Sequence, residues 1–196
     1  MRSISSASTS AWCAVGRTMT TTDGSPLIDM STEEAWVESV WNGTVQLYSN
    51  PAVQDLCLAL QDEEGVCIPT LFCVCFAAVA GLLPPRERIR SLIAGYDPAR
   101  LEIATIRAQR RAARPPDGHI SGKQVYEELK KHELIAERAL MAALSAQLYR
   151  EARPDLYTHV ADDRAVHILL GDGPKPGAPA LFQLLLAIRP LVRRPA

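Results

Sequence analysis

The chain has 196 residues, of which 47% are hydrophobic and 22% charged, with a formal net charge of −1. This length allows one domain with extensions or at most two small domains. The charge balance excludes a protein that is electropositive overall. Residues that favour helix dominate the middle of the chain, and runs of β-branched residues are sparse, so we predict an all-α fold. We expect a compact bundle of about six helices over residues 31–153, with a helical appendage at the carboxyl end.

Residues 1–29 are predicted to be a disordered leader. They contain few large apolar side chains to repay the entropy of ordering. Arg2 and Arg17 occur without an acidic residue before Asp23, which resembles a transit peptide, but the apolar core of a secretory signal is lacking. Translation could also begin at Met19 or Met30, and we favour this because Met30 directly precedes a helix cap. A chain that starts at Met30 is expected to be as stable as the full chain.

Helix signals begin at Ser31, where Ser31-Thr32-Glu33-Glu34 has the pattern of a capping box. The first helix is expected to run to about Tyr48. Asn50 and Pro51 then predict the cap and first turn of a second helix, which Gly65 ends. The segment from Ser31 to Gly65 has seven acidic residues and no lysine or arginine.

The run from Val66 to Leu83 has no charged side chain. A helix that is apolar all round must be covered by other helices or by lipid. The run is only just long enough to span a bilayer, and Pro69 and Gly81 interrupt it. We therefore predict a buried helix over about 68–80, at the centre of the fold.

Three helices are expected after Pro84-Pro85, of which the first is short and the last is long. They cover about 86–94, 98–114 (with Asp97 as its cap) and 122–152. The long helix has one stripe formed by Val125, Leu129, His132, Ala136, Ala139 and Ala143, and a second formed by Leu134, Met141, Leu144 and Leu148. Residues 154–196 are predicted to be a linker with two further helices, at about 160–170 and 180–191.

The five cysteines are expected to be reduced and mostly buried, in a cytoplasmic protein. Cys73 and Cys75 are two residues apart, so on a helix their sulfur atoms lie on different faces. The sequence therefore predicts no metal site, and it indicates no cofactor.

Two stretches are the most specific in the chain: Leu56–Gln61 (LCLALQ) and Glu133–Arg138 (ELIAER). Together with Trp41, Leu47-Tyr48 and Arg107…Arg110-Arg111, they resemble the DUF2390 family of small, uncharacterised proteobacterial proteins. The resemblance covers about residues 31–150. It implies a bacterial, cytoplasmic, helical domain and brings no activity or catalytic residues with it.

An arginine stripe is the strongest polar feature. It contains Arg107, Arg110 and Arg111, while the next helix has a like-charged pair, Glu133 and Glu137, one turn apart. Because a loop of modest length joins the two helices, they should pack antiparallel. We predict that at least one of these arginines bonds Glu133 or Glu137. If the arginines were instead open to solvent, helix 98–114 would be a candidate surface for nucleic acid, which we consider the less favoured reading.

Three function classes stay open. The leading hypothesis is a non-enzymatic protein-interaction module, since no catalytic motif occurs and an apolar C-terminal helix could dock on a partner. The second is a ligand binder or enzyme with an interhelical pocket lined by Trp36, Trp41 and Tyr48. The third is nucleic-acid binding. A grouping of Glu128, His132, Glu133 and Glu137 could suggest acid–base chemistry, but His132 is expected only to pair with Glu128 one turn back. The sequence does not indicate the oligomeric state.

Overall fold

The computed structural model describes residues 28–115, 123–152, 161–171 and 176–192. Over these residues the all-α prediction is confirmed: the chain forms helices and no strand. The leader up to residue 27, the loop 116–122 and the linker 172–175 lie outside the described residues. The helices are α1 (Glu33–Tyr48), α2 (Pro51–Glu64), α3 (Ile68–Ala80), α4 (Arg86–Gly95), α5 (Asp97–Ala112), α6 (Lys123–Glu151), α7 (Ala161–Leu170), α8 (Ala178–Ile188) and a 3-10 turn (Arg189–Leu191).

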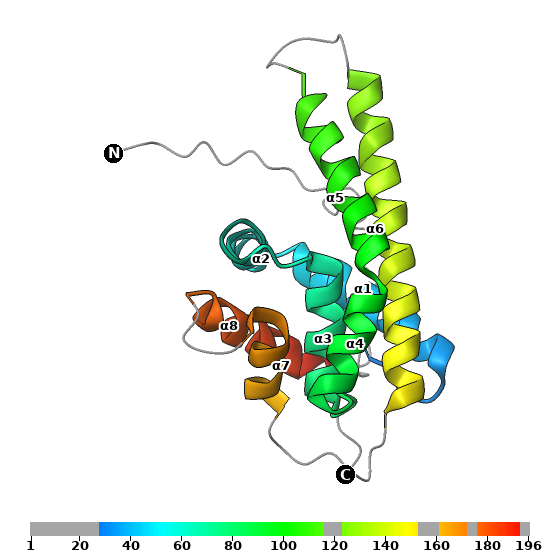
Figure 1. Cartoon of the computed structure of the whole chain (residues 1–196), viewed down its shortest axis with the longest axis vertical. Helices are drawn as coiled ribbons and strands as arrows, with labels where there is room; N and C mark the ends of the chain where they lie inside the picture. Colours follow the sequence, from blue (N-terminus) through cyan, green and yellow to red (C-terminus); the bar gives the residue numbers. More distant parts are fainter. Residues whose placement is uncertain (1–27, 116–122, 153–160, 172–175, 193–196) are drawn as a thin grey trace, which may run out of the picture.

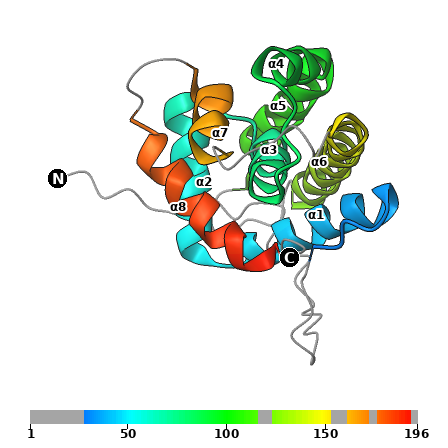
Figure 2. The same cartoon turned by 90° about the horizontal axis from the view of Figure 1, so that it is seen from below.

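The uncharged helix α3 is the centre of the fold, as the sequence predicted. Every residue from Ile68 to Val79 is buried. Figure 2 shows α3 surrounded by its neighbours, and it packs against α1, α6, α7 and α8. Phe72 and Phe76 are completely buried and contact each other, with ring centroids 6.4 Å apart. Burial on all sides explains why the helix needs no polar face.

The ends of α2 and α3 follow from local chemistry. The Asn50 side chain accepts a hydrogen bond from the amide of Ala52, and Pro51 occupies the first turn of α2. Gly65 ends this helix with φ 67°, a left-handed conformation that glycine adopts without a steric penalty. The sequence predicted both ends correctly.

Two predicted caps are wrong. The first helix is capped by Thr32, whose hydroxyl accepts from the amide of Ala35, while Ser31 donates its amide to Asp29. In α5, Asp97 is already a helical residue, and its carboxylate accepts a bond from Arg100 at 2.6 Å. In both places a neighbouring partner competes for the polar side chain, and the capping pattern does not reveal that competitor.

The two C-terminal helices pack onto the bundle. Leu181, Leu184 and Ile188 of α8 are completely buried, and α8 contacts α2 and α3 while α7 contacts α3. The amide of Gly177 bonds the Glu64 carboxylate at 2.8 Å. A β-carbon at residue 177 would lie 2.8 Å from Cγ of Glu64, so this close approach of α8 to α2 needs glycine. Most of the apolar surface that the sequence offered to a partner is therefore used within the chain.

Within the part of the chain that the structure describes, no single helix has both the length and the apolar character needed to cross a membrane. Among the described helices, only the consecutive pair α2 and α3 has enough length and apolar character to span a membrane, and the pair is bent by 115° at the break between the two helices.

Two residues of the predicted leader, Ile28 and Asp29, contact the bundle, so the predicted boundary needs correction at these positions. Ile28 is 3% exposed and lies in the core, and the amide of Asp29 donates to the Ser39 hydroxyl at 2.9 Å. Ile28 lies in a short apolar stretch before the first helix, which is too short to show a helical periodicity, and this is why the sequence pattern missed it.

A chain truncated to begin at Met30 is therefore expected to be less stable than one that begins at Pro26. The truncation removes the buried Ile28 side chain, whose burial contributes about 1.5–3 kcal/mol. Urea denaturation of the two chains measures the difference. Equal unfolding midpoints would show that Ile28 contributes nothing and that the original boundary was right.

The cysteines give a second expected result. Cys57, Cys67, Cys73 and Cys75 are free thiols, and only Cys67 is not buried. Burial raises the pKa of Cys57 and of Cys73 to about 12, so both thiols are neutral at pH 8. Brief alkylation of the native protein at pH 8 should label Cys67 and spare Cys57 and Cys73, as read by peptide mass spectrometry. Equal labelling of all three would contradict the packing around α3.

Candidate functional site

Helices α5 and α6 run antiparallel, as predicted, and their far ends rise beyond the other helices (Figure 1). We call residues 103–115 and 123–137 the arm. The C-terminal half of α6 buries mainly apolar residues, among them Leu140, Met141, Leu144 and Leu148. In its N-terminal half the buried residues are Glu133 and Glu137. The arm therefore depends on charged groups where the bundle depends on apolar packing.

Three side chains form the centre of the arm. Arg107 donates from Nε to Oε1 of Glu133 and from Nη2 to Oε1 of Glu137, both at 2.7 Å. One guanidinium thus bridges two carboxylates that would otherwise repel each other one helical turn apart. Arg110 donates from Nε to the second oxygen of Glu133. We call Arg107, Arg110, Glu133 and Glu137 the arginine–glutamate cluster.

The cluster is dry. Glu133 is 2% exposed, Glu137 1% and Arg110 6%. Burial by itself would lower the pKa of Arg107, but hydrogen bonds and the charges of Glu133 and Glu137 outweigh it, so this pKa lies above its ordinary value. The pKa of Arg110 is raised in the same way, against the effect of burial, mainly by Glu133. Both guanidiniums are therefore charged at neutral pH.

The remaining member of the stripe, Arg111, makes an exposed pair. Arg111 lies 3.7 Å from Asp62 of α2, with both side chains more than half exposed. Such a pair contributes little to stability. Arg111, although predicted with Arg107 and Arg110, is therefore not part of the buried cluster.

The predicted grouping around His132 is divided by the structure. Glu133 and Glu137 are buried against α5, whereas the side chain of His132 is exposed. Glu128 bonds Lys131 at 2.7 Å, and Lys131 lowers the pKa of Glu128 more than the charge of His132 does, so the expected pairing with His132 is secondary. Among the residues described, no group of three or more His, Cys, Asp or Glu could hold a metal ion.

The three aromatic residues predicted to line a pocket lie in the core. Trp36 is completely buried and donates from Nε1 to the carbonyl of Ser145 at 3.0 Å. Tyr48 packs edge-on against Phe72, and the Arg138 guanidinium lies 5.1 Å from the Trp41 ring centroid. A pocket that the structure shows among the described residues lies elsewhere, between α5 and α6.

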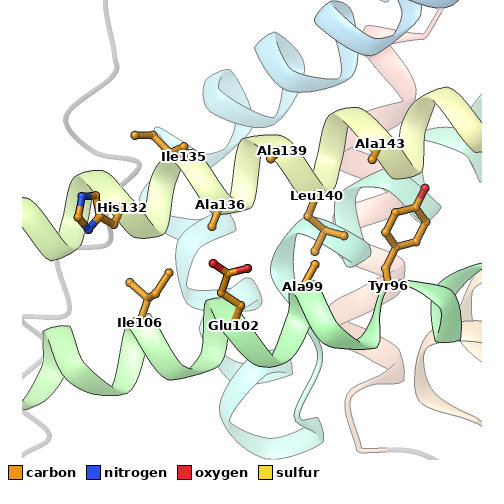
Figure 3. A pocket seen from close by; sticks show the side chains of 10 residues that line it. All are labelled: Tyr96, Ala99, Glu102, Ile106, His132, Ile135, Ala136, Ala139, Leu140 and Ala143. Atoms are coloured by element: carbon orange, nitrogen blue, oxygen red, sulfur yellow. The ribbon is translucent and has the colours of Figure 1, made fainter.

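This pocket is an open groove of about 590 Å³ (Figure 3). Small and apolar side chains make up most of its lining, and Figure 3 shows Ile106 at the end near His132 and Tyr96 at the end near Ala143. The lining residues are Tyr96, Ala99, Glu102, Ile106, His132, Ile135, Ala136, Ala139, Leu140 and Ala143.

One wall of the groove contains part of a regular stripe of α6, which we call the seam; its residues from His132 to Ala143 line the groove, and its first two residues lie beyond it. Its positions alternate in steps of four and three residues, the spacing of a helix that packs along another helix. Val125 at its start is 57% exposed, and the neighbouring Ile135 is 66% exposed. The sequence showed this stripe, but its periodicity does not tell whether a partner inside the chain covers it. The seam consists of Val125, Leu129, His132, Ala136, Ala139 and Ala143.

The family relationship can now be stated. Residues 39–144 match the family model described as "Protein of unknown function (DUF2390)", which is more than half of the chain. The chain belongs to the DUF2390 family. The matched region of this DUF2390 protein contains the whole arginine–glutamate cluster and every residue that lines the groove, and it ends before α7. No curated protein and no solved structure matches the chain.

Proposed function

We propose that this DUF2390 protein is a protein-interaction module that receives one α-helix of a protein partner in the groove between α5 and α6. The observation that carries the proposal is the seam, an apolar stripe with helix-packing spacing that faces solvent. Alanine at three consecutive seam positions lets another helix approach closely, because interaxial distance depends on the side chains at the contact.

The chemistry of the groove fits a helix better than an extended peptide. An extended peptide adds to a sheet edge through main-chain bonds, and an amphipathic helix places its apolar side chains into a groove. The groove lies between two helices and has an apolar floor, so it matches the second mode. The complementary helix carries large apolar side chains where the seam carries alanine.

The other two hypotheses have less support. Nucleic-acid binding through α5 would use Arg107 and Arg110, yet both guanidiniums are engaged by buried carboxylates. A small-molecule pocket at Trp36, Trp41 and Tyr48 would require rearrangement of the core, because all three are buried. For the compartment we propose the bacterial cytoplasm, which the free thiols of the described cysteines favour.

The test is a matched pair of charge substitutions at exposed alanines. Ala139→Glu places a carboxylate in the seam, and Ala108→Glu places one on α5 outside the groove; both alanines are exposed. The native complex in extracts of the host cell should be lost with the first variant and kept with the second, as read by size-exclusion chromatography. Unchanged elution of both variants, with equal thermal stability, would refute the proposal.

A further inference from the structure

We infer that the helix received by the groove is α6 of a second copy of this chain, in antiparallel orientation. This inference rests on the proposed function and names its partner. It is argued from the order of large and small side chains along the seam, and from the charges at the two ends of α6.

Side-chain size changes along the seam in one direction. Its N-terminal half carries Val125, Leu129 and His132, and its C-terminal half carries alanine at 136, 139 and 143, followed at the next step by Ala146. A second α6, reversed and centred between Ala136 and Ala139, would place Leu129 and His132 of each copy against alanines of the other. Close packing favours such pairing of large with small side chains.

Two pairings define this register. Leu129 of one copy meets Ala146 of the other, and His132 meets Ala143, which borders Tyr96 at its end of the groove. A parallel pair would place Leu129 against Leu129 and alanine against alanine, with crowding at one end and a void at the other. The size pattern is therefore complementary to itself only when one helix is reversed.

The shape of the molecule fits the same arrangement. The large half of the seam lies on the arm, which rises beyond the bundle (Figure 1), and the alanine half lies where α6 is packed on the bundle. Reversal of the second copy places each arm along the α6 surface of the other bundle. The bundles lie on the outer sides of the pair, since the seam faces away from the buried side of α6.

Charges at the ends of α6 also favour reversal. The side chain of Glu128 is 51% exposed and that of Arg150 59% exposed. In the antiparallel register Glu128 of one copy comes within about three residues, or about 4.5 Å of helical rise, of the level of Arg150 of the other, which is within reach of these two long side chains. Within each chain Glu128 bonds Lys131 and Arg150 bonds Glu33. A contact between Glu128 and Arg150 would link these two ion pairs across the copies.

The test uses two cysteines on one chain, His132→Cys with Ala143→Cys. Within a chain these positions are about 16 Å apart along the helix, too far for a disulfide. In the antiparallel pair each faces the other residue of the second copy. Mild oxidation of the purified double variant should give a dimer that reducing agent dissolves, while either single variant and the parent chain stay monomeric under denaturing electrophoresis.

Each other outcome has a definite meaning. A covalent dimer of the single His132→Cys variant would indicate a parallel pair and overturn the inference. A monomer in every variant, together with the mass of one chain in sedimentation equilibrium of the parent, would also overturn it. Loss of a larger host complex with Ala139→Glu would in that case leave the proposed function standing with a different protein as partner. For a true dimer, Ala139→Glu should raise the dissociation constant by about tenfold or more.

Discussion

Phe72→Ala is expected to lower the free energy of unfolding by about 3–5 kcal/mol. Phe72 is completely buried in the middle of α3, between Tyr48 and Phe76. Truncation removes the apolar surface of the ring and leaves a cavity, because helices on several sides fix the surrounding side chains. Urea denaturation followed by circular dichroism measures the loss.

The chain offers a matched control for this substitution. Phe182 of α8 is 37% exposed, so Phe182→Ala should cost clearly less than Phe72→Ala. If the two substitutions cost the same, or if Phe72→Ala cost less than about 1 kcal/mol, α3 would not be the packed centre of the fold.

Glu133→Ala is expected to destabilise the chain by about 3–5 kcal/mol, since it leaves Arg110 without its buried carboxylate and Arg107 with Glu137 alone. Arg107 and Arg110 both donate to Glu133, and the Arg110 side chain is only 8% exposed. Removing one partner of a buried ion pair is costly even where the intact pair contributes little net stability. Because the effect falls on the arm, amide hydrogen exchange should rise first in α5 and the N-terminal half of α6.

Double-mutant cycles separate the pair energies from these other effects. The cycles of Arg107 with Glu137 and of Arg110 with Glu133 should each give a coupling of about 1 kcal/mol or more. The exposed pair of Arg138 with Glu38 is the control, and its coupling should lie within about 0.5 kcal/mol of zero. A coupling energy near zero in both buried pairs would make Arg107 and Arg110 candidates for binding nucleic acid again.

The sequence predicted best what the chain decides locally. The bounds of α3 follow from Gly65, Gly81 and the lack of charge between them. The antiparallel packing of α5 on α6 follows from a short connection and from like charges that need a counter-ion. In each case, a few neighbouring residues contain all the necessary information.

The sequence predicted less well what depends on distant partners. In the sequence, the seam looks like the second stripe of α6, which consists of Leu134, Met141, Leu144 and Leu148. Three residues of that second stripe are completely or almost completely buried, while the seam borders an open groove. Ile28 is buried by contact with α1, and α8 is held by α2 and α3. Periodicity identifies an apolar face, and the tertiary fold decides what covers it.

The most direct test of the docking surface is photo-crosslinking in living cells. A photoreactive amino acid at position 139, in the seam, is compared with one at position 108, on α5 outside the groove. We expect a discrete protein adduct at position 139, with the attachment site on one face of a helix, and no such adduct at position 108. If the partner is a second copy, mass spectrometry should place the attachment near Ala136 of α6. Adducts of equal yield at both positions, or none at position 139, would contradict the account.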